Sequence, residues 1–242
     1  LANTGGFSAR LITFGTHPGA MVRTGEIDLS SSGSTFDFTT PWGDGRVQLK
    51  LLGRFNVSNA LAAIGACGAL GVDPKLAADV LSEMTSVPGR LEPVRNSRGF
   101  SIFVDYAHTP DALANVLRAL REVTDKRLIV VFGCGGNRDR GKRPIMGSAA
   151  ATLADYSIVT SDNPRGEDPA AIIAEITAGF GASKSFEVEA DREKAIARAL
   201  TLARSGDTVL IAGKGHESVQ EFANTVVPFD DRDVVKRQLT RI

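Results

Sequence analysis

Four short segments of the sequence concentrate residue types that bind charged small molecules. Each mixes glycine or proline with acidic, basic or amide side chains, and each follows a short apolar run. The segments are 105–111 (DYAHTPD), 133–143 (GCGGNRDRGKR), 161–165 (SDNPR) and 213–217 (GKGHE). A single segment of this kind is typical of a polar loop that caps a helix, but four of them together predict a binding site.

The Asp-Asn-Pro-Arg sequence suits an amino acid. Pro164 stiffens the turn, and an arginine held after it can bind a carboxylate through two parallel hydrogen bonds. Asp162 and Asn163 can take an ammonium group, so the segment complements a zwitterion. The alternative is a surface turn in which Arg165 pairs with the nearby Glu167 or with its neighbour Asp168.

The second segment matches the G-x-x-x-x-G-K spacing of a P-loop over residues 136–142. Arg143, however, stands where a P-loop has the Ser or Thr that holds magnesium, so we interpret the match as false. The segment is a cationic loop suited to phosphate or carboxylate, with Arg138 as its candidate ligand. Arg140 and Lys142 are expected to be solvated.

The last segment adds a carboxylate, Glu217, beside two glycines. Gly213 and Gly215 allow the backbone to come close to a ligand. His108 and His216 have side chains that can act as bases, but isolated loop histidines more often position other groups, and we assign them no catalytic role.

The elements that must position these segments alternate in type. Short apolar runs of β-forming residues precede the four segments, and apolar residues at helical spacing lie between them, as in 113–120 and 172–180. The runs cover residues 102–104, 128–132, 157–160 and 208–212. This pattern predicts an α/β domain over 89–242, a Rossmann-like, mainly parallel sheet with helices on both faces. Ligands of such sheets bind at the carboxyl ends of the strands, where the four segments should meet.

Residues 1–88 have a different pattern, with too few strands for a complete α/β domain. We therefore predict that they form part of a larger α/β domain that precedes the Rossmann-like one. The expected strands are 9–15, 34–40 and 46–52, the last two as a hairpin, and the expected helices are 56–70 and 74–84.

Composition excludes several classes of protein. The 242 residues are 43% hydrophobic and 23% charged, as in soluble globular proteins. Because 28 basic residues balance 28 acidic ones, no overall field favours nucleic acid or an anionic membrane as partner. The longest uncharged apolar run, 60–72, is too short to span a bilayer. The two cysteines, Cys67 and Cys134, are typical of reduced thiols, so a cytoplasmic location is expected.

Together these segments resemble the Mur ligase family, in its diaminopimelate-adding branch, from about residue 34 onwards. Residues 53–59, 89–90 and 105–110 are similar to segments that the family shares with folylpolyglutamate synthetases. The segments specific to the branch are 133–144, 162–165 and 213–217. The resemblance implies residues 1–88 as the last part of the family's central ATP-binding domain and 89–242 as its C-terminal domain.

The resemblance implies an ATP-dependent amide-bond ligase of peptidoglycan precursor synthesis. Such an enzyme uses ATP and Mg²⁺ to add meso-2,6-diaminopimelate to UDP-MurNAc-L-Ala-D-Glu through an acyl phosphate. The implied ATP-binding residues are Asn56, Asn59, Arg90, Asp105 and His108. The implied diaminopimelate-binding residues are Arg138, Asp162, Asn163, Arg165, Gly213 and Glu217.

Arg165 is the residue expected to decide which amino acid binds. Diaminopimelate has a second carboxylate that lysine lacks. A site that pairs this carboxylate with Arg165 leaves a buried guanidinium unpaired when lysine enters, at a cost of about 3–5 kcal/mol.

The sequence also departs from the family. The P-loop, the magnesium-binding acidic residues, the carbamylated lysine and the domain that holds the UDP-sugar are all expected before Leu1. No catalytic or metal-binding residue is therefore assigned, and we expect a monomer that neither hydrolyses ATP nor ligates. The alternatives are a non-catalytic amino-acid- or nucleotide-binding module and, ranked below it, a folylpolyglutamate-type ligase, in which the Asp-Asn-Pro-Arg segment has no purpose.

Overall fold

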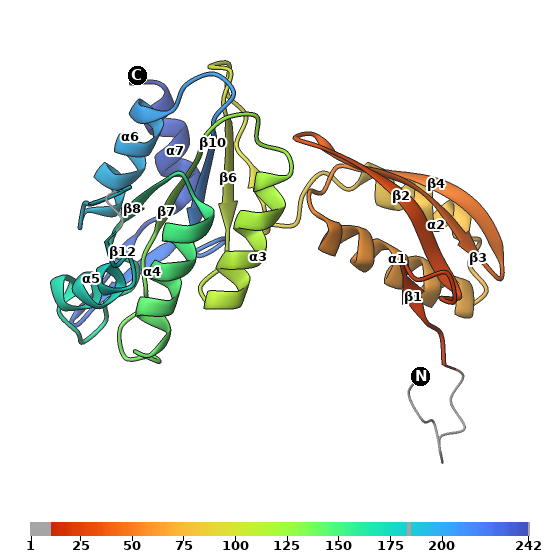
Figure 1. Ribbon diagram of the computed structural model, residues 1–242, viewed down its shortest axis with the longest axis horizontal. Helices are drawn as coiled ribbons and strands as arrows, with labels where there is room; N and C mark the ends of the chain where they lie inside the picture. The colour runs from red at the N-terminus through yellow and green to blue at the C-terminus, as the bar shows by residue number, and fades with distance from the viewer. Residues whose placement is uncertain (1–10, 183–184, 242) are drawn as a thin grey trace, which may run out of the picture. The chain divides into compact units, whose positions relative to one another are not determined.

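The computed structural model describes residues 11–182 and 185–241. The chain divides into two compact units, one ending at Thr85 and the other beginning at Ser86 (Figure 1). This division lies a few residues before the boundary predicted after residue 88.

The N-terminal unit is a four-stranded sheet with two helices packed on it. The strands follow one another in order, β1 parallel to β2 and the rest antiparallel. The elements are β1 (Phe14–Gly15), β2 (Val22–Ser30), β3 (Gly33–Thr40), β4 (Gly43–Leu49), α1 (Arg54–Ala69) and α2 (Pro74–Glu83). Asp73 caps α2 by accepting a hydrogen bond from the Lys75 N–H, and a proline at the first helical position favours this start.

The predicted hairpin is confirmed by β3 and β4, and both predicted helices are confirmed by α1 and α2. Strand β2 was not predicted, because Gly25, Glu26 and Asp28 interrupt its apolar alternation. Of the strand predicted at 9–15, only Phe14–Gly15 is a strand, and residues 9 and 10 lie outside the described part of the chain.

The C-terminal unit is built on a six-stranded sheet with the order β5-β6-β10-β7-β8-β9. All neighbours are parallel except the edge strand β5, which runs antiparallel to β6. The strands are β5 (Glu92–Pro93), β6 (Ser101–Asp105), β7 (Leu128–Phe132), β8 (Tyr156–Val159), β9 (Phe186–Val188) and β10 (Thr208–Ala212). The four predicted strands are thus confirmed, whereas β5 and β9 are short and only partly buried and carry no apolar run.

Helices cover both faces of this sheet, as predicted (Figure 1). The strands are apolar on both sides: in β7, Ile129 and Val131 join the core beneath α6 and α7, and all five residues of the strand are buried. The helices are α3 (Pro110–Arg121), α4 (Lys142–Leu153) and α5 (Pro169–Ala178) on one face, and α6 (Arg192–Leu202) and α7 (Asp231–Leu239) on the other.

The strand order decides which loops are neighbours. Strand β10 lies between β6 and β7, and β8 follows β7, so the carboxyl ends of these four strands form one continuous edge. A small antiparallel hairpin, β11 (Val219–Phe222) and β12 (Thr225–Pro228), follows β10. It joins the loop after β8 through a parallel bridge between Phe222 and Arg165. Among the described residues, no helix is long and apolar enough to cross a membrane.

Candidate functional site

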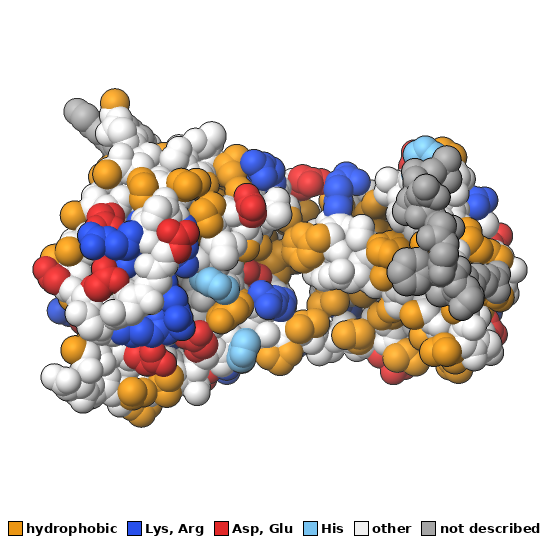
Figure 2. Space-filling view, turned by 90° about the horizontal axis from the view of Figure 1, so that it is seen from below, with side chains coloured by type: hydrophobic (Ala, Val, Ile, Leu, Met, Phe, Trp, Pro, Cys, Tyr) orange, Lys and Arg blue, Asp and Glu red, His pale blue; other side chains and the backbone are white. Residues whose placement is uncertain are grey.

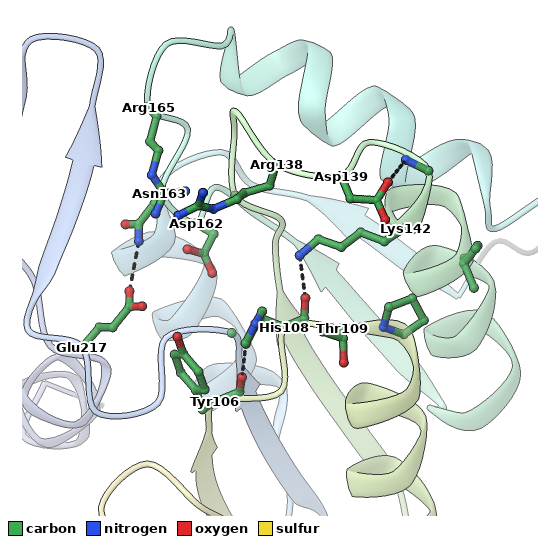
Figure 3. A pocket seen from close by; sticks show the side chains of 15 residues that line it. Tyr106, His108, Thr109, Arg138, Asp139, Lys142, Asp162, Asn163, Arg165 and Glu217 are labelled. Carbon is green, nitrogen blue, oxygen red and sulfur yellow. Dashed lines mark hydrogen bonds between the residues drawn. The ribbon is translucent and has the colours of Figure 1, made fainter.

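A pocket of about 720 Å³ lies at this edge of the sheet and is lined by all four polar segments (Figure 3). Figure 2 shows basic and acidic side chains side by side on the C-terminal unit. The predicted residues that line the pocket are His108, Arg138, Asp162, Asn163, Arg165, Gly213 and Glu217. The lining residues that were not predicted to bind a ligand are Tyr106, Thr109, Pro110, Gly135, Asp139, Gly141, Lys142 and Ile145. The predicted diaminopimelate-binding residues therefore meet in one cavity.

Two glycines let the loops approach this closely. Gly213 has a φ of +119°, and a β-carbon there would lie 2.5 Å from Oδ2 of Asp162. At Gly136 a β-carbon would lie 1.8 Å from the carbonyl oxygen of Pro164. Any larger residue at either position would push the Asp-Asn-Pro-Arg loop away from its neighbours.

A fully buried lysine lies behind the acidic side of the pocket. The Lys214 ammonium donates to Asn163 Oδ1 at 2.9 Å and to Glu217 Oε2 at 3.2 Å. Asn163 Nδ2 donates to the same carboxylate oxygen at 3.0 Å (Figure 3). These bonds fix two lining side chains from strand ends 54 residues apart in the chain. Sequence reasoning missed this role, although a lysine between two glycines at a strand end was a signal for it.

Arg165 is oriented by the hairpin. Its Nε donates to Glu221 Oε2 at 2.7 Å, and Nη1 donates to the carbonyl oxygen of Gly136 at 3.2 Å. The alternative surface turn is wrong, because Glu167 instead pairs with another arginine and Asp168 caps α5. Glu221 was missed because the sequence does not show that β11 runs beside this loop.

The buried Arg143 explains why the P-loop match fails. Its guanidinium forms salt bridges of 2.9 Å with Glu167 and Glu175, which fix the start of α4 to the loop before α5 and to α5 itself. The hydrogen bond from Arg143, aided by the Asn137 N–H, lowers the pKa of Glu167 to about 2. The position that would hold magnesium in a P-loop is here a structural cation.

The other basic residues of this loop differ in their roles. Arg140 is exposed, as expected, and pairs with Glu175. Lys142 is half-exposed, and beyond the expectation it lines the pocket and donates to the carbonyl oxygen of His108 at 2.7 Å. Arg138 is exposed at the mouth of the pocket and points toward Asp162 (Figure 3).

The residues expected to bind ATP are divided between the units. In the C-terminal unit, the Arg90 guanidinium lies 5.1 Å from the centre of the Tyr106 ring, and the His108 ring packs edge-on at 4.5 Å from the same ring. Both carboxylate oxygens of Asp105 accept backbone N–H groups, from Leu91 at 2.7 Å and Ala107 at 2.8 Å. Burial raises the pKa of Asp105, and its hydrogen bonds tie the β6 end to the loop before β5.

In the N-terminal unit, Asn56 and Asn59 occupy the first turns of α1. Asn56 is buried and donates to the carbonyl oxygen of Leu52 at 2.8 Å, while Asn59 is exposed and donates to Asn56 Oδ1 at 3.2 Å. Only the Asn59 side chain is therefore open to solvent.

Metal ligands and thiols are the other reactive groups to place in the part of the chain that the structure describes. No group of three or more His, Cys, Asp or Glu side chains there has the arrangement of a metal site. Cys67 and Cys134 are both free, and burial raises the pKa of Cys134 to about 12, so this thiol is not a nucleophile at neutral pH.

The fold and the pocket define an α/β protein with a pocket of mixed charge at the carboxyl edge of a parallel sheet, the edge where such sheets bind ligands. Residues 89–215 match the family described as "Mur ligase, glutamate ligase domain", and residues 2–67 match "Mur ligase middle domain". The chain belongs to the Mur ligase family.

Several similar proteins are named UDP-N-acetylmuramoyl-L-alanyl-D-glutamate--2,6-diaminopimelate ligase. The Syntrophomonas wolfei protein of that name is 49% identical over 221 residues, covering 90% of this chain and 45% of its own length. The Streptomyces coelicolor protein is 48% identical over 232 residues, covering 93% and 46%. The chain therefore spans about half the length of the curated relatives that it matches.

Solved structures agree in fold. A structure of a ligase with the same name has a TM-score of 0.71 and 40% sequence identity, covering 95% of this chain and 47% of that one. Folylpolyglutamate synthase from Mycobacterium tuberculosis, complexed with ADP, has a TM-score of 0.66 and 21% identity, covering 80% and 45%. The second likeness shows the shared fold alone.

Proposed function

We propose that this chain carries the amino-acid-binding part of an ATP-dependent ligase. The reaction is the addition of meso-2,6-diaminopimelate to UDP-MurNAc-L-Ala-D-Glu through an acyl phosphate. The names of the relatives support this proposal. The observation that carries it is the charge arrangement of one pocket, in which Arg165 and Arg138 line the same cavity as Asp162 and Glu217.

This arrangement suits an amino acid with two zwitterionic ends. Asp162 and Glu217 can accept hydrogen bonds from an ammonium group, and the two arginines can each pair with a carboxylate. The expectation that Asn163 also takes the ammonium group is wrong, because its Oδ1 already accepts from Lys214 and from the Glu221 N–H. Lysine has one carboxylate fewer and leaves one of these cations without a partner. The role of the chain's own residues is to bind the amino acid, hold its reacting amine in one orientation and exclude water from it.

We propose that each unit holds nucleotide-binding residues: Arg90 and His108 in the C-terminal unit, and Asn59, oriented by the buried Asn56, in the N-terminal unit. The rings of Tyr106 and His108 suit stacking with the base of a nucleotide, and the Arg90 guanidinium beside them suits its phosphates. Asp105 contributes by fixing the backbone around them. When bound, ATP would supply the phosphoryl group that activates the acceptor carboxylate.

Magnesium is not assigned to any residue of this chain, because the described residues hold no cluster of ligands suited to it. We propose that residues 1–88 are the last part of a central ATP-binding domain and that 89–242 are the C-terminal domain, in agreement with the family matches at 2–67 and 89–215. The expected cytoplasmic location and monomeric state belong to the same proposal.

Calorimetric titration of the purified chain with meso-diaminopimelate and with lysine tests the binding role. We expect diaminopimelate to bind at least about tenfold more tightly, as for the loss of one charged hydrogen-bonded pair. Arg165→Ala should abolish this preference by weakening diaminopimelate binding without changing lysine binding. Arg198→Ala is the control, because Arg198 pairs with Glu187 outside the pocket. Equal affinity of the wild type for both ligands would overturn the proposal.

A further inference from the structure

The β11–β12 hairpin follows the Asp-Asn-Pro-Arg loop almost residue by residue. Gln220 Nε2 donates to the carbonyl oxygen of Asp162 at 2.6 Å, and the Glu221 N–H donates to Asn163 Oδ1 at 3.1 Å. The Arg165 N–H in turn donates to the Glu221 carbonyl oxygen at 3.0 Å. Three residues of the pocket wall therefore take their position from two residues of one strand.

Glu221 also acts through its side chain. Its Oε2 accepts from Arg165 Nε at 2.7 Å, while Gly136 accepts from Nη1 on another part of the guanidinium. A β-carbon at Gly135 would lie 3.0 Å from Nη1, so the guanidinium packs against glycine backbone as well. The Arg165 side chain is thus held at two of its nitrogens and keeps 27% of its surface exposed.

These contacts determine which edge of the guanidinium a ligand can use. An arginine pairs with a carboxylate in two ways, through Nε and Nη2 on its side or through Nη1 and Nη2 at its end. Glu221 occupies Nε, and no hydrogen bond to Nη2 is found within the described residues. Nη1 donates one of its two hydrogens to Gly136 and keeps the other, so the end carrying Nη1 and Nη2 is the edge left for an incoming anion.

We propose that Glu221 is a positioning residue for amino-acid choice: by binding Arg165 Nε, it presents the Nη1–Nη2 end to the second carboxylate of the ligand. The inference rests on the proposed function, because it assumes that this pocket takes a diamino diacid. The opposite role is that of a counter-ion that competes with the ligand for Arg165. When the charge is removed and the hydrogen-bond acceptor is kept, the positioning role predicts unchanged diaminopimelate binding and the counter-ion role predicts tighter binding.

Two substitutions of similar size separate these roles. Glu221→Gln keeps an acceptor for Nε but removes the charge, and Glu221→Met removes both while preserving length. We expect Glu221→Gln to keep the wild-type preference for meso-diaminopimelate over lysine within about twofold. Glu221→Met should reduce that preference about tenfold, through weaker diaminopimelate binding at unchanged lysine binding.

Glu187→Met is the matched control, because Arg198 Nε also donates to a glutamate carboxylate there, Glu187 Oε1 at 2.9 Å, outside the pocket. Its titrations should equal those of the wild type, and thermal unfolding of each variant verifies that it is folded. If both Glu221 variants bind diaminopimelate more tightly than the wild type, Glu221 is a counter-ion and the inference is overturned. An unchanged preference in Glu221→Met overturns it as well.

A second readout separates this inference from the proposed function. The Nε–H proton of Arg165, assigned by its loss in Arg165→Lys, should exchange slowly with water in the wild type and in Glu221→Gln. It should exchange rapidly in Glu221→Met. If the wild type shows no preference between the two amino acids, the proposed function fails. If the preference is present but the proton is equally protected in Glu221→Met, only the positioning role fails.

Discussion

Arg165 adopts a backbone conformation that residues with a β-carbon rarely take, with a φ of +50°. Such a conformation costs about 1–2 kcal/mol and persists only where surrounding contacts impose it. Three hydrogen bonds impose this conformation on Arg165: its N–H and its Nε donate to Glu221, and its Nη1 donates to Gly136. The strain therefore lies at the residue whose direction matters most for the pocket.

Lys214 supports the side of the pocket formed by Asn163 and Glu217, which we call the acidic wall. Replacing it by methionine keeps its length but leaves Asn163 Oδ1 and Glu217 without their cation. We expect Lys214→Met to lower the free energy of unfolding by about 1–3 kcal/mol and to weaken diaminopimelate binding. Urea denaturation and calorimetric titration measure the two effects.

The matched control for this substitution is Lys194→Met, since Lys194 is exposed and lies 3.8 Å from Asp191 in a surface pair. Such pairs contribute little to stability. If the two lysine variants are equally stable and bind the amino acid equally well, Lys214 does not support the wall.

At the scale of elements, the loop between β7 and α4 is fixed by the ion pairs of Arg143 with the α5 region. Because the pKa of Glu167 falls from 4.5 to about 2 on folding, its contribution to stability is complete above about pH 4.5 and is lost as the pH falls toward 2. We expect the difference in free energy of unfolding between wild type and Glu167→Gln to shrink over this pH range.

Urea denaturation at a series of pH values gives this difference directly. In an Arg143→Met background, the difference made by Glu167→Gln should depend less on pH between about 2 and 4.5, and the part that remains belongs to the hydrogen bond from the Asn137 N–H. A wild-type difference that is constant over the same range contradicts the assignment of the salt bridge as the cause.

Sequence patterns predicted the central elements and missed those that depend on neighbours. The runs at 128–132 and 208–212 consist almost entirely of apolar residues, so their burial could be predicted from the sequence. Strand β11 alternates buried Gln220 with exposed or partly exposed residues and has no apolar face to reveal it. Lys142 and Glu221 were missed for the same reason, because each acquires its role from a segment distant in the chain.

At the scale of the whole molecule, zero net charge is the sum of local charges of opposite sign (Figure 2). Arg138 and Arg165 share one pocket with Asp162 and Glu217, so a zwitterion meets both signs within the same cavity. The pocket-lining residues all belong to the C-terminal unit, whereas Asn56 and Asn59 belong to the other. The proposed amino-acid binding is thus separable from the rest of the proposed reaction.

If amino-acid binding and the reaction are separable, the chain alone should not carry out the reaction. Incubated with ATP, Mg²⁺, UDP-MurNAc-L-Ala-D-Glu and meso-diaminopimelate, the purified 242-residue chain should release no phosphate and form no peptide bond. The reason is that no P-loop was found in this sequence and no cluster suited to magnesium lies among the described residues. Turnover by the purified chain, measured by phosphate release and by mass spectrometry of the product, contradicts it.

The position of β10 also has a consequence for synthesis on the ribosome. It comes after β5 to β9 in the chain, yet it lies between β6 and β7 in the sheet. A growing chain that has exposed β6 and β7 must leave their edges unpaired until residues 208–212 emerge. Glu217, which completes the acidic wall, emerges only after that strand. Nascent chains that end before β10 have neither a complete sheet nor a complete binding pocket. Ligand binding can therefore stabilise only nearly finished chains.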